Sequence, residues 1–372
     1  MNILYITKLN GNPSTGPHYS VPKSIEAQGK IDNVYWFNIN KVYSAQWENY
    51  NVSFANSTDY KISSISVLPK PFDNPDIIIV EQFYNYPFSK IIYDIQKKKI
   101  PYVIVPRCEM TEKAMAQKSF KKRVANFFFF KRMVQKSAAI QYLTKEEAEE
   151  SKKQWKHNFY VMPNGICVPP FENKNIKRDN LVLSYIGRLD INQKGLDLLL
   201  DAIKDLKNLL KNNQVNINLY GPDKNNSVRL INKYINKEQL TDIIRIYPPA
   251  FGEKKKEILE STDVFIMTSR FEGHPMGLIE ALSYGIPCLI TRGTNMLEEV
   301  EEFQAGWVSE NNLDGIKNAI IKMLNERNEI SAKREAAYHL AEKYDWDTIA
   351  KETHRELTKI LESYHNTNEN YT

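Results

Sequence analysis

Short apolar runs alternate with amphipathic stretches along most of the chain. A short apolar run between turn residues predicts a buried strand, whereas apolar positions that recur at helical spacing predict a helix. In the first half, the runs that predict strands are Ile3–Thr7, Val34–Ile39, Asp76–Val80, Tyr102–Val105, Ile140–Leu143 and Tyr160–Met162. None of them falls in Tyr43–Pro75, which is polar and irregular.

The pattern breaks at Pro169–Asn175, where proline, asparagine and charged residues predict a linker. The strands predicted beyond it are Leu181–Ile186, Val215–Tyr220, Ile243–Ile246, Val264–Met267, Pro287–Ile290 and Gly306–Val308, with helices such as Leu196–Leu210 and Leu313–Leu324 between them. This alternation predicts an α/β protein with parallel sheets. Two such series predict two doubly wound domains, with ligands near the carboxyl ends of the strands.

The length of 372 residues agrees with two domains. We expect a first domain over residues 1–170 and a second over residues 171–346. In residues 347–372 we expect a helix, about Asp347–Glu362, and a polar tail. Because the first series lacks a final covering helix, this helix is expected to cross back to the first domain.

The composition excludes several classes of protein. Apolar residues make up 42% of the chain, which argues against a disordered protein. The three cysteines, Cys108, Cys167 and Cys288, are widely spaced and form no CxxC pair, which argues against a disulfide scaffold or a zinc ribbon. No apolar run approaches the roughly 18 residues of a membrane span, and none resembles a signal peptide. We therefore expect a soluble, cytoplasmic protein.

The net charge is only +5, but positive charge is concentrated in Lys118–Lys136, which contains no acidic residue. On a helical wheel, the apolar stripe of this segment consists of Phe120, Val124, Phe127 and Val134, and the opposite arc of Lys121, Lys122, Arg132 and Lys136. Such a helix could be a domain helix with a solvated basic face, or could contact anionic lipid. Nucleic acid is disfavoured, because Phe127–Phe130 form a block and are not interleaved with the cations.

Two carboxylates flank the start of a predicted helix within Asp263–Gly285. Glu272 lies in the turn after a buried strand, and Pro275 suits the first position of the helix. The free amides at Met276, Gly277 and Leu278 would form an anion site suited to phosphate. Glu280 lies among apolar residues of the same helix, where a carboxylate is costly unless a ligand diol or another donor binds it. The alternative is a Glu272 that only complements the helix dipole and a Glu280 on the surface.

A second polar segment follows the strand Leu181–Ile186. Gly187 ends this strand, and the loop after it carries Arg188 and Lys194, a planar fork and a point charge that together suit a diphosphate. The loop is neither a GxGxxG nor a P-loop, so neither a dinucleotide dehydrogenase nor an NTPase is supported. Taken alone, two cations in a loop are as readily explained by solvation.

Together the two segments read G-R-L-x4-K-G and, further on, E-G-x-P-x4-E-A, and this combination resembles the retaining glycosyltransferases of family 4, which have the GT-B fold. The resemblance covers the second half, including Tyr220-Gly221-Pro222, Gly306 and Trp346. In the first half, Gly11–Pro22 resembles the family's glycine-containing first loop, and Val105–Met110 resembles its P-R-G segment.

The resemblance implies two Rossmann-like domains that face each other across a cleft. It implies transfer of a sugar, with retention and without a metal or other cofactor, from a UDP- or GDP-sugar to a saccharide acceptor. That acceptor is expected to be lipid-linked, in assembly of a capsule, exopolysaccharide or O-antigen, on the inner face of the membrane. A small soluble molecule or a protein as acceptor, and a basic nucleic-acid-binding module, are the alternatives.

The resemblance also assigns the residues. Arg188, Lys194 and Glu272 would be catalytic, with the two cations on the diphosphate and Glu272 on the sugar hydroxyls. Glu280 would bind the ribose diol and the backbone at Ala250 the base. The remaining donor-binding residues would be Gly16, Gly187, Gly273, His274, Met276, Gly277 and Leu278. Arg107 and Glu109 would lie on the acceptor and sugar side.

The sequence departs from the family pattern at several positions. The first loop offers only Gly16 where two adjacent glycines are usual, and Cys108 replaces the glycine of P-R-G. Pro248 stands where a glycine often precedes the base-contacting residue. His18 is a poor substitute for the histidine that many members carry near the sugar.

Overall fold

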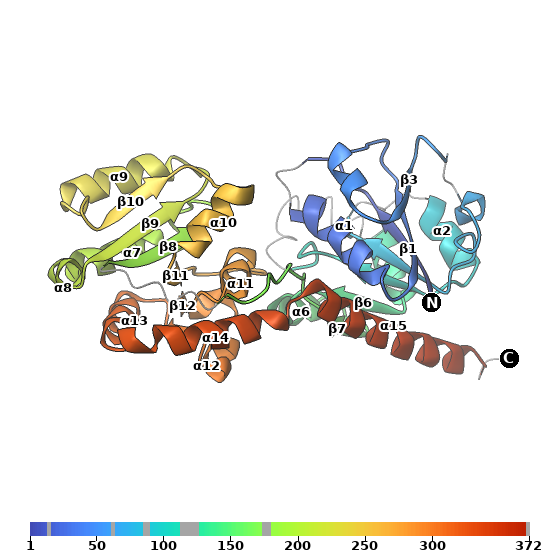
Figure 1. Cartoon of the computed structure of the whole chain (residues 1–372). Helices are drawn as coiled ribbons and strands as arrows, with labels where there is room; N and C mark the ends of the chain where they lie inside the picture. The colour runs from blue at the N-terminus through green and yellow to red at the C-terminus, as the bar shows by residue number, and fades with distance from the viewer. Residues whose placement is uncertain (13–15, 61–63, 85–89, 112–125, 173–179, 370–372) are drawn as a thin grey trace. The chain divides into compact units, whose positions relative to one another are not determined.

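The structure is a computed structural model, and it describes the chain except for residues 13–15, 61–63, 85–89, 112–125, 173–179 and 370–372. The chain forms two compact units, which Figure 1 shows. Met1–Gly165 and Trp346–Thr372 make up the first unit, and Ile166–Asp345 makes up the second. The second unit is therefore inserted between two segments of the first.

The first unit contains a seven-stranded sheet in the order β3-β2-β1-β4-β5-β6-β7. Its strands pair in parallel and are β1 (Asn2–Thr7), β2 (Asn33–Asn38), β3 (Ser53–Asn56), β4 (Ile77–Glu81), β5 (Tyr102–Val105), β6 (Ala139–Tyr142) and β7 (Phe159–Val161). The other described elements of this part are α1 (Gly16–Gln28), η1 (Ala45–Asn49), η2 (Ile65–Val67), α2 (Lys90–Lys97), η3 (Asn126–Phe130), α5 (Lys131–Gln135) and α6 (Lys145–Lys152).

The central strands of this sheet are buried on both faces. Along β1, Leu4 and Ile6 belong to one hydrophobic cluster, whereas Ile3 and Tyr5 belong to another. Because successive side chains of a strand point to opposite faces, two apolar layers require an unbroken apolar run. This explains why the strand could be recognised from the sequence as a continuous run.

The last helix, α15 (Trp346–Glu369), covers the same face of this sheet as α1. Leu357 of α15 is fully buried in the cluster that contains Val21 and Ile25 of α1. At the start of α15, Trp346 packs against Ala27. The final segment of the chain is thus part of the first unit's core.

The second unit contains a six-stranded sheet in the order β10-β9-β8-β11-β12-β13. Its parallel strands are β8 (Leu181–Ile186), β9 (Val215–Tyr220), β10 (Ile244–Tyr247), β11 (Val264–Met267), β12 (Cys288–Thr291) and β13 (Gly306–Ser309). The helices are α7 (Leu196–Asp205), α8 (Lys207–Asn212), α9 (Ser227–Lys237), α10 (Gly252–Glu260), α11 (Met276–Ser283), α12 (Leu297–Phe303), α13 (Leu313–Asn325) and α14 (Ile330–Glu342), with the short turns η4 (Arg292–Thr294) and η5 (Arg327–Glu329).

The α/β prediction with parallel sheets is confirmed, and two local expectations are wrong. The predicted helix Leu196–Leu210 is interrupted at Leu206, between α7 and α8. The polar region Tyr43–Pro75 contains β3, which was not predicted. This strand lies at the edge of the sheet and pairs only with β2, so it buries few side chains and has no apolar run.

The turn after β5 has two consecutive residues in the left-handed region. Arg107 has φ +50° and Cys108 has φ +66°, a conformation that favours glycine. The backbone N–H of Cys108 donates to the buried Glu147 carboxylate, which keeps the turn in place. Burial raises the pKa of the Cys108 thiol to about 12, so the side chain stays neutral. The φ value also explains why a glycine is common at this position in the P-R-G segment.

We expect Cys108→Gly to be more stable than Cys108→Ala by about 1 kcal/mol, because both lose the thiol and only alanine keeps the left-handed penalty. Urea unfolding of the two variants measures the difference. In an ordinary helix the order would be reversed. Equal stability, or a more stable alanine variant, would show that the turn relaxes without cost.

Candidate functional site

The predicted donor residues of the second unit meet at the carboxyl ends of β8 and β11, which are neighbours in the sheet. The loop after β8 passes so close to the end of β11 that a Cβ on Gly195 would lie 2.1 Å from the carbonyl oxygen of Thr268. Gly195 also has φ +60°. The Thr268 hydroxyl lies 3.2 Å from the carbonyl oxygens of both Lys194 and Gly195. The end of β11 therefore fixes the loop that carries Lys194.

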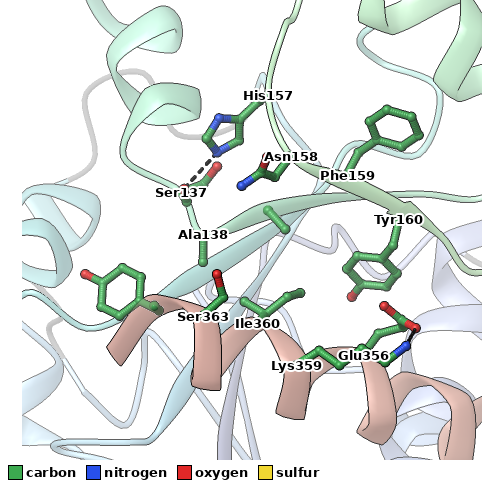
Figure 2. Close-up of a pocket in the computed structure, with 12 residues that line it drawn as sticks. Ser137, Ala138, His157, Asn158, Phe159, Tyr160, Glu356, Lys359, Ile360 and Ser363 are labelled. Carbon is green, nitrogen blue, oxygen red and sulfur yellow. Dashed lines mark hydrogen bonds and ion pairs between the residues drawn. The ribbon is translucent and has the colours of Figure 1, made fainter. Parts of the chain in front are cut away.

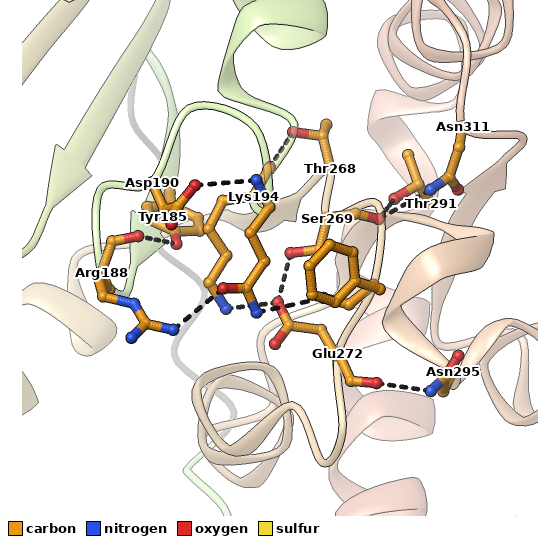
Figure 3. A network of polar contacts seen from close by, with 12 residues as sticks. Tyr185, Arg188, Asp190, Lys194, Thr268, Ser269, Glu272, Thr291, Asn295 and Asn311 are labelled. Carbon is orange, nitrogen blue, oxygen red and sulfur yellow. Dashed lines mark hydrogen bonds and ion pairs between the residues drawn. The ribbon is translucent and has the colours of Figure 1, made fainter. Parts of the chain in front are cut away.

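Lys194 and Glu272 form a buried ion pair between these two loops, as Figure 3 shows. Lys194 Nζ lies 2.5 Å from Glu272 Oε1, and the two side chains are only 11% and 8% exposed. The Ser269 hydroxyl donates to the same carboxylate oxygen. Within the described part of the chain, Glu272 Oε2 accepts no hydrogen bond and is left for another donor.

Three further polar side chains hold the backbone around this pair (Figure 3). The Ser269 carbonyl oxygen accepts from the Thr291 hydroxyl at 2.8 Å and from Asn311 Nδ2 at 3.1 Å. Asn295 Nδ2 donates to the Glu272 carbonyl oxygen at 2.8 Å. These residues come from the end of β12 and from the loops after β12 and β13, so four strand ends contribute to the site.

Arg188 lies on the same loop as Lys194, but its side chain is exposed. Its Nη2 donates to Gln193 Oε1 at 3.1 Å, and its carbonyl oxygen accepts from the Tyr185 hydroxyl at 2.9 Å. Burial, and then the Glu272 carboxylate, raises the pKa of Tyr185, which keeps that hydroxyl protonated as a donor. Gly187 precedes Arg188 and donates its N–H to the Tyr220 carbonyl oxygen at 2.9 Å. The structure thus brings Arg188, Lys194 and Glu272 into one region.

The start of α11 differs in part from the prediction of three free amides. The Met276 N–H donates to the His274 carbonyl oxygen and the Leu278 N–H to that of Pro275, each at 2.9 Å. Of the three predicted amides, that of Gly277 has no protein acceptor among the described residues. These two amides are bonded because the turn before the helix is tight. Pro275 immediately precedes α11 and is not its first residue.

His274 has a buried imidazole in this turn. Its Nε2 has no hydrogen-bond partner among the described residues, and its ring lies 5.8 Å from that of Tyr344. Burial lowers the pKa of His274 to about 4, so the ring is neutral at neutral pH. These contacts favour packing, and a donor-binding role for His274 stays a prediction. The neighbouring Gly273 is exposed.

The expectation that Glu280 lies on a largely buried part of its helix is wrong. Glu280 Oε2 forms a short ion pair with Lys255 Nζ, from α10, and the Glu280 side chain is 35% exposed. Lys255 reaches the carboxylate because α10 lies beside this part of α11. The diol-binding role of Glu280 stays a prediction, but the burial argument for it does not hold.

The segment between β10 and α10 contains the predicted base-contacting residue, Ala250. This residue is half-buried and packs against the core of the second unit. Phe251 beside it is 76% exposed. Tyr220 and Tyr247, at the ends of β9 and β10, stack with ring centroids 4.8 Å apart. Aromatic surface is therefore present near the place expected for a base.

Comparison with known proteins decides the family. Residues 170–343 match the family described as "Glycosyl transferases group 1". The second unit, Ile166–Asp345, is therefore a group 1 glycosyltransferase domain. This group is family 4, a retaining family, and its enzymes use nucleotide-sugar donors.

Two curated relatives act in polysaccharide or lipid-linked saccharide assembly, by their names. The glycosyltransferase is 27% identical over 191 residues to the UDP-Gal:alpha-D-GlcNAc-diphosphoundecaprenol alpha-1,3-galactosyltransferase of Escherichia coli, covering 45% of each chain. It is 29% identical over 153 residues to a putative colanic acid biosynthesis glycosyltransferase of Salmonella typhimurium, covering 39% of this chain and 36% of the relative. The chain thus matches less than half the length of either relative.

A solved structure supports the fold over nearly the whole glycosyltransferase. The Anabaena protein HepE, in complex with UDP, superposes with a TM-score of 0.70 at 15% identity, over 96% of this chain and 100% of HepE. The GT-B class predicted from the sequence is confirmed.

In the first unit, the predicted acceptor-side residues are engaged in internal contacts. Arg107 binds both oxygens of Glu81, at 2.6 and 3.1 Å, and its Nη1 also reaches Asn164 Oδ1 at 3.0 Å. Glu109 accepts the backbone N–H groups that follow β4, at residues 83 and 84. These contacts shape the loops at the carboxyl ends of β4 and β5, and the acceptor role of both residues stays a prediction.

The first loop of the glycosyltransferase lies partly outside the described residues, which resume at Gly16, the start of α1. His18 is fully buried in α1, where its Nε2 lies 2.8 Å from Gln46 Oε1 and its ring packs near Trp47. For Gly16 and His18, contact with the ligand stays a prediction.

Figure 2 shows a pocket of about 310 Å³ in the first unit, between α15 and the amino ends of β6 and β7. None of the predicted site residues lines it. Several of its polar groups are paired within the protein: His157 Nε2 lies 2.8 Å from the Ser137 carbonyl oxygen, and Lys359 pairs with Glu356 at 2.7 Å. In parallel α/β sheets ligands bind at the carboxyl ends of strands, so this pocket is a poor candidate for the active site.

The basic segment Lys118–Lys136 is described only from Asn126 onward, and the predicted face at Phe120–Val124 lies outside the described residues. In the described part, Met133 and Val134 are buried, whereas Lys131, Arg132 and Lys136 are exposed. Across the described ranges, no helix has the length and apolar character to cross a membrane. Over the same ranges, no three acidic, histidine or cysteine side chains gather as metal ligands would.

Several site residues were not found from the sequence: Gln193, Lys255, Ser269, Thr291, Asn295 and Asn311. Ser269 and Thr291 carried a signal, because polar residues at or just beyond the carboxyl end of a buried strand lie at the edge where ligands bind. The others lie in loops or on a charged helix where their residue types are common.

His274 should make the stability of the glycosyltransferase depend on pH. The unfolded chain binds a proton near pH 6.5, whereas the folded chain does so only near pH 4, so stability is lost as pH falls through this window. His274→Phe, which keeps a ring against Tyr344, should remove about 2 kcal/mol of the difference in unfolding free energy between pH 7.5 and pH 5. Urea unfolding at both values measures it. If wild type and His274→Phe lost the same unfolding free energy between pH 7.5 and pH 5, His274 would be protonated in the folded protein.

Proposed function

We propose that this glycosyltransferase moves a sugar from a UDP- or GDP-sugar to a lipid-linked saccharide in the assembly of a surface polysaccharide. The observation that carries the proposal is the buried Lys194–Glu272 pair, with Arg188 on the same loop, at the carboxyl ends of β8 and β11. Two cations beside a carboxylate match a diphosphate joined to a polyhydroxylated sugar.

Arg188 and Lys194 would bind the diphosphate. Lys194 has three N–H donors, so it can keep Glu272 and still donate to a phosphate oxygen. Arg188 is exposed and can turn its planar guanidinium toward a second oxygen. As the bond to the sugar breaks, negative charge grows on the diphosphate, and both cations stabilise it more strongly than in the ground state.

Glu272 and Glu280 would recognise the two sugars of the donor. In each, one carboxylate oxygen is bound by a lysine, and the other accepts no hydrogen bond in the described residues. Glu272 Oε2 would accept a hydroxyl of the transferred sugar, and Glu280 Oε1 the ribose diol. The Gly277 N–H would donate to the donor at the start of α11.

The acceptor is proposed from the relatives and from the basic segment. The Escherichia coli relative is named for an acceptor on diphosphoundecaprenol, a lipid. In this chain, the exposed Lys131, Arg132 and Lys136 lie near Phe129, which is 41% exposed. Exposed cations next to an apolar ring favour contact with an anionic membrane surface. We therefore propose that the enzyme works peripherally on the inner face of the membrane.

Hydrolysis of UDP-glucose, UDP-galactose, UDP-N-acetylglucosamine and GDP-mannose tests the donor class directly. We expect wild type to hydrolyse at least one of them slowly without an acceptor, and faster with a polyprenyl-diphosphate saccharide. Absence of both turnover and binding for all four would contradict the proposal.

The two glutamates should differ in their kinetic effects. Glu280→Gln weakens ribose binding, which is equal in the ground and transition states, so the donor KM should rise roughly tenfold while kcat falls less. Glu272→Gln acts on the sugar, and kcat should fall by about 10²-fold with KM nearly unchanged. Steady-state kinetics with the hydrolysed donor measure both.

Asp242→Asn serves as the control for these variants, because Asp242 is exposed and pairs with Lys211 away from the site. It should leave kcat and KM unchanged. If Glu280→Gln bound UDP and GDP as wild type does in calorimetry, the proposed ribose site would be wrong.

Replacing Lys121, Lys122, Arg132 and Lys136 by glutamine should reduce co-sedimentation with anionic vesicles roughly tenfold or more. Salt should shrink the difference through screening. A matched control replaces the exposed Lys224, Lys233, Lys237 and Lys254 of the second unit, which changes the net charge equally and should leave vesicle binding intact. Equal losses in both variants, or no wild-type binding at low salt, would contradict a specific membrane surface.

A further inference from the structure

Ser269 is held at both ends directly after β11. Its carbonyl oxygen accepts hydrogen bonds from Thr291 and Asn311, which fix the backbone. Its hydroxyl donates to Glu272 Oε1, and the whole residue is excluded from solvent. The direction of this hydroxyl is therefore set by the fold and not by solvent.

The contacts of Glu272 distinguish its two oxygens. Oε1 receives both Lys194 Nζ and the Ser269 hydroxyl, whereas Oε2 receives no hydrogen bond from the described residues. A lysine is a point charge on a flexible stem and can follow either oxygen if the carboxylate turns. A hydroxyl fixed by its own backbone cannot. Ser269 is thus the contact that determines which oxygen faces Lys194.

We propose that Ser269 is a positioning residue that fixes the Glu272 carboxylate, so that Oε1 holds Lys194 and Oε2 faces a hydroxyl of the donor sugar. The inference rests on the proposed function, since it takes the sugar as the partner of Glu272. Ser269 touches neither the donor nor the reacting atoms and acts only through Glu272. It would also favour donors that carry a hydroxyl at the position Oε2 reaches.

The chain offers a matched control in Ser283 of α11. This serine is also buried, and its hydroxyl donates to the Glu280 carbonyl oxygen one turn earlier in the same helix. Ser283→Ala removes the same atom at similar burial in the same unit, but releases no carboxylate. A merely structural effect of losing a buried hydroxyl should appear in both variants.

The test is a double-mutant cycle with the donor that wild type hydrolyses. We expect Ser269→Ala to lower kcat about tenfold with donor KM within about twofold of wild type, because orientation and not binding is lost. In the Glu272→Gln background the same change should lower kcat by less than about twofold, since the carboxylate it positions is gone. Ser283→Ala should match wild type, and UDP or GDP affinity by calorimetry should not change in any of these serine variants.

Additive losses in the cycle, or equal losses in Ser269→Ala and Ser283→Ala, would overturn the inference. If Ser269→Ala lowers the melting temperature, Ser269→Cys replaces it, because a thiol has similar size but donates weakly and should give the same loss in kcat. A fully active Glu272→Gln variant would instead refute the proposed function. An impaired Glu272→Gln with a normal Ser269→Ala would refute only the role of Ser269.

Discussion

Lys194 and Glu272 are buried together at the ends of two neighbouring strands, and each is the ion-pair partner of the other. Removing one partner of such a pair leaves an uncompensated charge in a poorly solvated place, typically at a cost of about 3–5 kcal/mol. The pair therefore constrains everything around it. Thr268 fixes the loop of Lys194, Ser269 and Asn295 fix Glu272, and Thr291 and Asn311 fix Ser269. These contacts within the protein hold the geometry of the site.

The second glutamate follows the same chemistry in a more open setting. Glu280 also shares an oxygen with a lysine, but both side chains are partly exposed, so water and salt screen the Lys255 contact far more. A ligand can compete for such a carboxylate at little cost. In the proposed function, the rigid pair would lie where bonds change, and the more exposed pair would lie where the nucleotide is held.

The sequence allowed much of this to be predicted, and the reason is physical. Strands buried on both faces need unbroken apolar runs, so β5 and β11 could be located with their exact bounds. The edge strand β3 buries little and left no such run. Lys194 and Glu272 stand in spaced motifs with glycines that permit close loop contacts. Thr291 and Asn311 reach Ser269 only through the order of strands in the sheet, which no local pattern encodes. Lys255 lies on a charged helix where one lysine cannot be told from the next.

The division of the chain has a consequence for synthesis on the ribosome. The first unit is interrupted after Gly165 and is completed only by the segment that begins at Trp346. The inserted unit, residues 166–345, is contiguous and can fold as soon as it emerges. The first unit must wait, because the place of Leu357 in its core is unfilled until the last helix is made. Until then, part of the apolar face of its sheet is exposed. A chaperone could cover this surface during translation, and a premature stop codon would leave it exposed.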